Sequence, residues 1–465
     1  MSGLFNTIEI GRSTLSAQQA ALNVLNHNVA NANTPGYSRQ RVNLASRGML
    51  GYLAMSGAGG VEVSCIQRLT DPFLLGQIGR VHTDHGEQEA LSGGFDMLEI
   101  LFGEPVDEVL GEMGLGDAVS EFLSSWQTVI NPEMESDEAD MRGLIIESAR
   151  VMSQRFNSLA AGIIDLAEGL QADVRDQVDE VNRLLDDVAE LNHQISSSEV
   201  GESARGDLMD ARQIKLDRLA ELVGAEWEMD DSDHLQVRLG GRILLDHTTW
   251  HGIAAETLGS TSDRTRGARL ASLDDPNPLE APGGSLRGKL RLVNEEIPGL
   301  LDQLDKMAAT LIDKVNAIHQ AASGSTGGGV DIFVGTNAST IAVSRVILDN
   351  HEMLSLNGQM PGGQDIGSAI FALHTEPVDA AGGLTIEGMY STLVGDLGAR
   401  SASAAQMENA TGRLLESLEA KLESLTGVSV DEELTDMMVI QSTYQAASRV
   451  LAVVDELLET VLSIL

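Results

Sequence analysis

The sequence predicts a mainly α-helical protein, with long coiled-coil helices at its two ends, a helical body and a small β-containing insert. Three observations support this fold class. Apolar residues recur at alternating steps of three and four near both ends and in the middle, one stretch alternates apolar with polar residues, and Gly-rich breaks separate these regions. At 465 residues the chain exceeds the ~250–300 residues at which single cores stop growing, so we expect more than one packed unit.

The C-terminal region carries the most regular pattern. Its apolar positions obey a heptad, which places them on one narrow stripe of a helix. Such a stripe is typical of a helix that packs against partner helices, whereas a helix on a globular core usually shows a broader face. The stripe consists of Met437, Ile440, Tyr444, Ala447, Leu451, Val454, Leu458, Val461 and Leu465.

The N-terminal region shows the same rhythm, with interruptions at Gly11 and Gln18. We therefore expect the two terminal stripes to pack against one another in an assembled structure, as helices that line an inner tube. The apolar positions of this second stripe are Leu4, Ile8, Leu15, Leu22, Leu25 and Val29.

A turn should end the N-terminal helix near Asn33. Pro35 disfavours a helical conformation for Thr34, and the pair Pro35-Gly36 suits the centre of a type II turn. A simple helical scaffold has no need of this Asn-rich stop, so we count its residues as candidates for the assembly interface. They are Asn31, Asn33, Thr34, Pro35, Gly36, Tyr37 and Arg39.

The middle of the chain is predicted to be helical, with one β insert. Residues 174–195 form a long amphipathic helix, for which residues 300–318 are a plausible partner, and residues 95–165 read as further helices. Leu235, Val237 and Leu239 alternate with polar residues, and Gly240-Gly241 suits a two-residue hairpin. Residues 259–285 lack periodicity and are predicted to form a surface loop or a reduced insertion, and short strands are expected within 330–373.

These patterns suggest a division of the chain into six regions. The expected regions are an N-terminal helix and turn (1–70), the first half of a helical body (71–223), a β-hairpin insert with a variable loop (224–285), a long return helix (286–325), a short-strand region (326–400) and a C-terminal coiled-coil helix (401–465).

Composition excludes several classes of function. The formal charge of −40, from 70 acidic and 30 basic residues, disfavours binding to nucleic acid or to an anionic membrane. Cys65 is the only cysteine, so neither an internal disulfide framework nor a multi-thiolate zinc site is expected. The sequence shows no cleavable signal peptide and no apolar run that could cross a bilayer, which taken alone would indicate a cytoplasmic protein.

Catalytic and metal-binding interpretations are weak. His82 and His85 lie in the stretch VHTDH, and His247 and His251 are four residues apart but follow a predicted strand and lack the Glu of a zinc protease. The Gly-rich stretch 323–329 lacks the Lys-Ser/Thr ending of a phosphate-binding loop. We therefore expect no enzyme, no metal, no cofactor and no small-molecule substrate.

Four segments resemble the family of flagellar rod, hook and hook-associated axial proteins. The resemblance is most specific in the first segment, where Ser38-Arg39-Gln40 after the turn is more typical of the hook-associated branch than of the hook protein. The segments occur in the expected order as NVANANTPGYSRQ (28–40), GVEVSCIQRLTDPFLLGQ (60–77), DLMDARQIKLDRLAELVGAEWEM (207–229) and GVSVDEELTDMMVIQSTYQAASRVLAVVDELLETVL (427–462).

This resemblance implies an extracellular structural subunit that joins the flagellar hook to the filament and is required for filament assembly. It also implies self-association in a ring or tube, contacts with the hook protein and with the next hook-associated protein, and an export chaperone at the C-terminal segment. Export would proceed through the flagellar type III apparatus without a cleaved signal. The alternatives are another axial protein, of the hook or the rod, and a non-flagellar coiled-coil scaffold.

Overall fold

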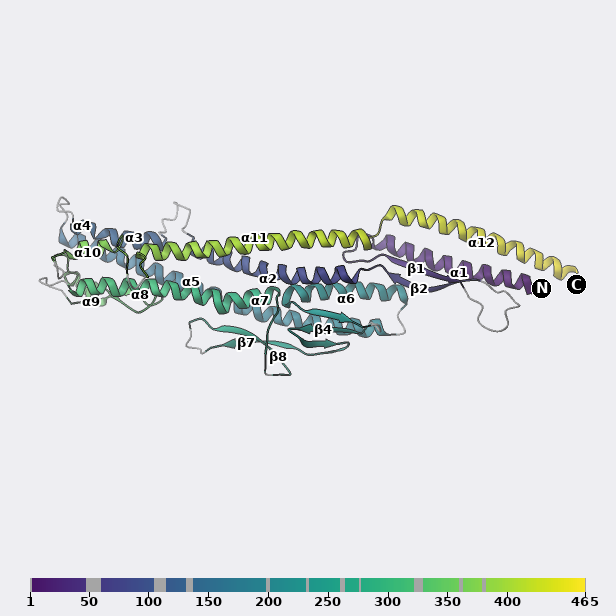
Figure 1. The fold of residues 1–465 in the computed structure, drawn as a ribbon, viewed down its shortest axis with the longest axis horizontal. Helices are drawn as coiled ribbons and strands as arrows, with labels where there is room; N and C mark the ends of the chain where they lie inside the picture. Colours follow the sequence, from purple (N-terminus) through teal and green to yellow (C-terminus); the bar gives the residue numbers. More distant parts are fainter. Residues whose placement is uncertain are drawn as a thin grey trace. The chain divides into compact units, whose positions relative to one another are not determined.

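The computed structural model describes residues 2–46, 60–103, 114–130, 137–197, 201–230, 234–259, 264–275, 277–321, 329–358, 363–378 and 382–464, without the side chains of 2–5 and 461–464. Leu4, Val461 and Leu465 therefore lie outside the described side chains. Within these ranges the protein is mainly helical with small sheets, which confirms the predicted fold class (Figure 1). The chain divides into two compact units, and the helices α2, α5 and α11 contribute residues to both.

The first unit comprises residues 1–84, 180–252 and 411–465, and so brings both terminal regions together with a central stretch. Its elements are α1 (Ser2–Asn31), β1 (Gln40–Ser46), β2 (Val61–Arg68), the first part of α2 (Pro72–Phe102), the last part of α5 (Glu138–Ser196), α6 (Glu202–Val223), β3 (Glu226–Met229), β4 (Leu235–Leu239), β5 (Arg242–Asp246), β6 (Thr249–Trp250), the last part of α11 (Ile386–Thr426) and α12 (Val430–Ile464).

Strands β1 and β2 form an antiparallel hairpin against α1. The pairing runs from Gln40 opposite Arg68 to Ser46 opposite Val61. A two-stranded hairpin is at best marginally stable alone and needs a covering element. In α1 the small side chains of Ala17 and Ala21 are buried at 2% and 8% exposure, which lets the helix approach its neighbours closely.

The predicted β-hairpin of the insert is confirmed. Leu239 pairs with Arg242, so Gly240 and Gly241 form the two-residue turn, and both have the positive φ (56° and 81°) that such a turn requires. Leu235, Val237 and Leu239 are fully buried on one face.

The part of α5 in the first unit has a partner helix that the sequence did not indicate. That part packs against α6, with ion pairs from Lys215 Nζ to Asp187 (2.6 Å) and from Arg218 Nε to Glu180 (2.8 Å). The connection at residues 197–201 is short, so the chain returns along the helix it has just left. The heptad pattern identified both helices but carried no information on which helix each would face.

The second unit comprises residues 85–179 and 253–410. Beyond its parts of α2, α5 and α11, its elements are α3 (Leu115–Ser125), α4 (Gln127–Ile130), β7 (Ile253–Leu258), β8 (Gly267–Ser272), β9 (Pro278–Leu279), α7 (Gly284–Arg291), the π-helical turn η1 (Leu292–Glu296), α8 (Ile297–Ala321), β10 (Phe333–Val334), β11 (Ala342–Val343), α9 (Arg345–Asp349), the 3-10 turn η2 (His351–Met353) and α10 (Ile366–Ala372).

One continuous hydrophobic core holds this unit together. It includes Phe122, Trp126 and Phe156, all fully buried, and the ring of Phe122 meets that of Phe333 edge-on with 5.3 Å between centroids. Residues 300–318 lie in α8 and contribute to the same core as the first part of α5.

Two further expectations for this region need correction. Residues 259–285 are not simply a surface loop, because β8 pairs with β7 and buries Leu270, and α7 begins at Gly284. The alternation was missed because β8 is short and rich in Ala. Within 330–373 the strands are shorter than expected, and residues 345–349 form a helix. Helix α11 of this region is continuous from Ile386 to Thr426.

Candidate functional site

The turn after α1 has the predicted geometry. The backbone N–H of Tyr37 donates to the carbonyl of Thr34 over 3.2 Å, and Gly36 between them has φ +76°. A positive φ at the third residue of a turn, here Gly36 directly after Pro35, is the signature of a type II turn, and glycine adopts it at little cost. Asn33, Thr34, Pro35 and Gly36 are exposed, so the turn presents its backbone to solvent.

Asn28 fixes the start and the end of this turn. Its side chain is fully buried, and Nδ2 donates to the carbonyl of Gln40 (2.9 Å) and to Glu433 Oε2 (3.0 Å). Its Oδ1 accepts from the backbone N–H of Gln40 (3.0 Å) and from the Tyr37 hydroxyl (2.8 Å). Every hydrogen-bonding position of the amide is used, as expected for a buried polar group. The side chain of Asn28 thus acts as a strand partner for Gln40.

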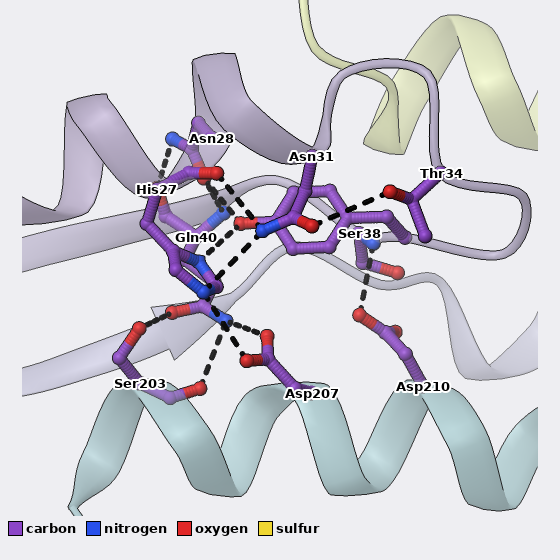
Figure 2. Close-up of polar contacts among 10 residues, drawn as sticks. His27, Asn28, Asn31, Thr34, Ser38, Gln40, Ser203, Asp207 and Asp210 are labelled. Atoms are coloured by element: carbon purple, nitrogen blue, oxygen red, sulfur yellow. Dashed lines mark hydrogen bonds and ion pairs between the residues drawn. The ribbon is translucent and has the colours of Figure 1, made fainter.

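Helix α6 anchors the other side of the turn, as Figure 2 shows. The N–H of Ser38 donates to Asp210 Oδ2 (3.0 Å), whose other oxygen lies 2.5 Å from Arg68 Nε. Gln40 Nε2 donates to Asp207 Oδ1 and to the carbonyl of Ser203, both over 3.0 Å. Burial raises the pKa of Asp210, while the positive charge of Arg68 opposes this rise.

His27 and Tyr37 extend the same hydrogen-bonded network. His27 Nε2 lies 3.2 Å from Asp207 Oδ2, and Nδ1 lies 3.1 Å from the Tyr37 hydroxyl. Burial and the nearby charge of Asp207 raise the pKa of Tyr37 well above its usual value. Tyr37 therefore stays protonated and serves as a hydrogen-bond donor to Asn28. Asn31 closes the cluster by donating to the carbonyl of His27 over 3.1 Å.

Arg39 ties the turn to the start of α12. Its Nε lies 2.6 Å from Glu433 Oε1, and its terminal nitrogens lie 3.2 Å from Glu432 and 3.7 Å from Asp436. Glu433 is fully buried, so Arg39 and Asn28 together compensate a carboxylate that would otherwise be costly to bury. The backbone N–H of Arg39 also donates to the carbonyl of Thr426 at the end of α11 (2.8 Å). We call Asn28, Tyr37, Ser38, Arg39 and Gln40 with their partners Asp207, Asp210 and Glu433 the turn cluster.

Helices α1 and α12 pack side by side within one chain and run in opposite directions, since Asn28 meets Glu433 near one end and Gly11 meets Leu451 farther along. A Cβ at Gly11 would lie 2.6 Å from Leu451 Cδ2, so the missing side chain makes room for the leucine. This close approach explains the break in the N-terminal stripe. The described stripe positions of α12 are buried or half-buried, namely Met437, Ile440, Tyr444, Ala447, Leu451, Val454 and Leu458.

On α1 the predicted stripe is only part of the buried surface. Ile8, Leu15, Leu22 and Val29 are half-buried and Leu25 is buried. The most buried positions also include a second row that the three-four pattern of large apolar residues did not select, namely Ala17, Ala21, Val24 and Asn28. Alanine and asparagine give a weak hydrophobic signal, although Asn28 belonged to the motif that carried the family resemblance.

Helix α12 also exposes an apolar surface that the sequence prediction missed. Counting 3.6 residues per turn places this surface on the side of α12 opposite the stripe that faces α1. We call it the outer face; it consists of Met438 (63% exposed), Val439 (60%), Val450 (51%), Val453 (56%) and Leu457 (49%). Large apolar side chains grouped on one exposed side of a helix mark an interaction surface more often than isolated ones do.

The histidines considered as metal ligands do not form a metal site in the described part of the chain. No group of three or more His, Cys, Asp or Glu side chains there could hold a metal ion. His247 follows β5 in a turn with φ 56°, and His251 follows β6, so the helical spacing needed by a zinc site is absent between them. His82 lies on α2, with Nε2 3.8 Å from Glu419. No described helix is long and apolar enough to span a membrane.

Comparison with known proteins identifies relatives of this chain. Residues 104–333 match the family model of the helical domain of flagellar hook-associated protein FlgK. Residues 8–37 match the flagella basal body rod protein model, and residues 424–464 match the C-terminal model of the flagellar basal body rod FlgEFG proteins. Flagellar hook-associated protein 1 of Bacillus subtilis is 25% identical over 100% of this chain and 99% of its own length. The chain resembles the flagellar hook-associated protein 1 family.

Two further similar proteins are covered less completely. Flagellar hook-associated protein 1 of Salmonella typhimurium is 28% identical over 72% of this chain and 59% of its own length. The solved structure of the flagellar hook junction protein FlgK from Burkholderia pseudomallei covers 56% of this chain and 46% of its own, with 21% identity and a TM-score of 0.46. That structural likeness is weak, and the family resemblance rests on the sequence. The rod-type models match the two terminal regions that pair as α1 and α12.

Proposed function

We propose that this protein is a structural subunit of the bacterial flagellum that joins the hook to the filament, and that it works by assembly rather than by catalysis. The observation that carries the proposal is the outer face of α12. One side of this helix covers α1, while the outer face exposes apolar residues that a neighbouring subunit would bury. Removing apolar surface from water contributes ~25 cal/mol per Å².

In this proposal the turn cluster holds α1 and α12 in one orientation, and neighbouring copies pack through the outer face to form a ring or tube. The candidate interface residues at the turn, from Asn31 to Tyr37, then lie at the end of each α1–α12 pair. The hook protein and the next hook-associated protein are the neighbours along the axis. Before assembly, an export chaperone covers the C-terminal segment, and export follows the flagellar type III route.

A matched set of substitutions tests the assembly role. Val450→Glu and Val453→Glu place a carboxylate on the outer face, whereas Gln445→Glu adds the same side chain at an exposed polar position of the same helix. In a deletion strain complemented with each variant, we expect hooks without filaments for the two valine variants and normal filaments for Gln445→Glu, as seen by electron microscopy.

Secretion must be measured in the same strains, because a variant that no longer binds the chaperone would also fail to assemble. Equal amounts of secreted protein with missing filaments support the assembly role. Normal filaments in both valine variants would exclude the outer face as a subunit contact.

A further inference from the structure

A groove of the first unit lies at one end of the α1–α12 pair. It has a volume of about 1050 Å³ and is bordered by the turn after α1, by α2 and α6, and by the connection from α11 to α12. Ile214 and Leu425 of its lining are 51% and 52% exposed, so the isolated chain leaves apolar surface of the groove in contact with water. The apolar lining comes from three helices and includes Leu75, Ile78, Ile214, Leu422 and Leu425.

Carboxylates outnumber cations in this groove. Glu416, Glu419 and Glu423 line it from α11, all at exposed positions, and Asp217 lines it from α6. The two arginines of the lining already pair with buried carboxylates of the turn cluster. His82 lies 3.8 Å from Glu419, and among the described residues no ion pair reaches Glu416 or Glu423. The groove therefore combines apolar walls with negative charge that the chain itself does not neutralise.

Asp217 shows the effect of this imbalance. Burial raises the pKa of Asp217 to about 7 and the negative charge of Glu419 adds to the rise, although Gln213 donates a hydrogen bond to the carboxyl group over 2.8 Å. A positive charge nearby would favour the ionised form of such a group. The occupant that complements the groove therefore presents both apolar side chains and a cation.

Helix α12 carries a stretch with this composition. Residues 437–454 contain no acid, in a chain with 70 acidic residues, and Arg449 is their one basic residue. Arg449 is exposed and forms no ion pair with another described residue. It precedes Val453 by four residues, so the two side chains are neighbours on the helix surface. The outer face thus presents a cation among large apolar side chains.

The outer face of the same chain cannot enter this groove. Glu432, in the first turn of α12, lines the groove, and α12 continues from there to Ile464 as one helix. Arg449 follows Glu432 by 17 residues, which is about 26 Å along the helix axis at ~1.5 Å per residue. Leu451 packs against Gly11 of α1 and holds this part of α12 away from the groove. A second copy must therefore supply the outer face.

We propose that the groove of one subunit binds the outer face of α12 of a second copy, with Arg449 placed among Glu416, Glu419 and Glu423. Every subunit carries both complementary surfaces, so each can bind one neighbour and be bound by another. Because the two surfaces differ, the contact is heterologous, and its repetition generates a ring or a helical array. This inference rests on the proposed function and names the surface that receives the outer face.

Cross-linking between two differently marked chains tests the contact. One chain carries Arg449→Cys and the other Glu423→Cys, both with Cys65→Ser so that no other thiol is present. The two chains are produced together in a deletion strain, and isolated hooks are treated with a short bismaleimide. We expect a mixed dimer whose cross-linked peptides mass spectrometry identifies. Glu228→Cys, at an exposed acid outside the groove, replaces Glu423→Cys in the matched control and should give no mixed dimer.

A charge swap provides an independent measurement. Like charges that face one another across an interface cost several kcal/mol, so Arg449→Glu should reduce the fraction of hooks that bear filaments roughly tenfold. Glu419→Lys with Glu423→Lys should also reduce it when Arg449 is present, and should restore it when combined with Arg449→Glu. Arg413→Glu, at an exposed base of α11 outside the groove lining, should leave the fraction unchanged.

The outcomes separate this contact from the proposed function. Hooks that contain both cysteine chains without the mixed cross-link, or an Arg449→Glu defect that the two lysines do not relieve, would overturn the groove contact. If the valine variants of the outer face still lack filaments in that case, the assembly role stands and only its receiving surface is wrong. Absence of the natural chain from isolated hooks would overturn both.

Discussion

Replacing Arg39 by alanine tests the turn cluster most directly. The substitution removes the cation 2.6 Å from Glu433, a carboxylate that is fully buried. Breaking a buried ion pair by removing one partner costs about 3–5 kcal/mol, because the other charge stays buried without compensation. Asn28 still donates to Glu433, and the Arg39 side chain is 23% exposed, so we expect a value near the lower limit, about 3 kcal/mol.

This cost should appear as easier separation of α12 from α1. At about 1.4 kcal/mol per tenfold, a loss of 3 kcal/mol speeds hydrogen exchange in α12 by roughly 10²-fold for amides that exchange through undocking. Exchange measured by mass spectrometry on peptides from 437–458 provides the readout.

Glu432→Gln is the matched control, because Glu432 contacts the same arginine at 3.2 Å but its side chain is 67% exposed. An exposed ion pair contributes only about 0–1 kcal/mol to stability, so hydrogen exchange in α12 should change little in this variant. The double variant Arg39→Ala with Glu433→Gln should regain most of the lost protection. Equal effects of Arg39→Ala and Glu432→Gln would refute the argument that burial of Glu433 makes this pair important.

Three further predictions concern other parts of the chain. Gly11→Val should weaken the pairing of α1 and α12, since its Cβ would lie 2.6 Å from Leu451 Cδ2, and Leu451→Ala in the same chain should restore part of the loss, measured by the same exchange experiment. Asp217→Asn should raise thermal stability at pH 8 but not at pH 4, because the pKa of Asp217 is raised from 3.8 to about 7 and the folded state therefore loses stability as pH rises between these values. In the second unit, burial lowers the pKa of His319, which accepts a hydrogen bond from the N–H of Ser355. The contribution of His319 to folding stability is therefore complete above the ordinary pKa of ~6.5 and declines as pH falls below that value. His319→Gln should flatten the resulting decline in melting temperature.

The sequence predicted the features that depend on local chemistry. The stop at Pro35-Gly36, the Gly240-Gly241 hairpin and the heptad stripe of α12 each follow from backbone preferences or from a period of apolar residues. The features it missed depend on which elements meet. A heptad pattern does not determine which helix it packs against, so the contact of α5 with α6 was not predicted. The row of Ala17 and Ala21 gave too little hydrophobic signal to be recognised.

The candidate site was predicted in the same partial way. Arg39 was predicted as a site residue from the motif. Its main partner, Glu433, could not be predicted, because a sequence does not distinguish a buried glutamate from an exposed one. Asp207 and Asp210 belonged to a segment that carried the family resemblance, yet nothing in their spacing placed them against Ser38 and Gln40. The outer face was overlooked because its residues interleave with the stripe on the same helix.

The hydrogen bond between Asn28 and Glu433 joins residues 405 positions apart, and this separation bears on the order in which the chain folds. Closing a flexible loop of that length costs about 5 kcal/mol in chain entropy, which the contact cannot repay until the intervening elements have shortened the effective loop. The pairing of α1 with α12 should therefore be among the last events of folding. A chain interrupted between Asn31 and Val430 would retain α1 but lack its partner helix, and Asn28 Nδ2 would lose its hydrogen bond to Glu433. The first helix thus cannot complete its packing until the last helix is present, so incomplete chains are excluded from the pair that the proposed assembly requires.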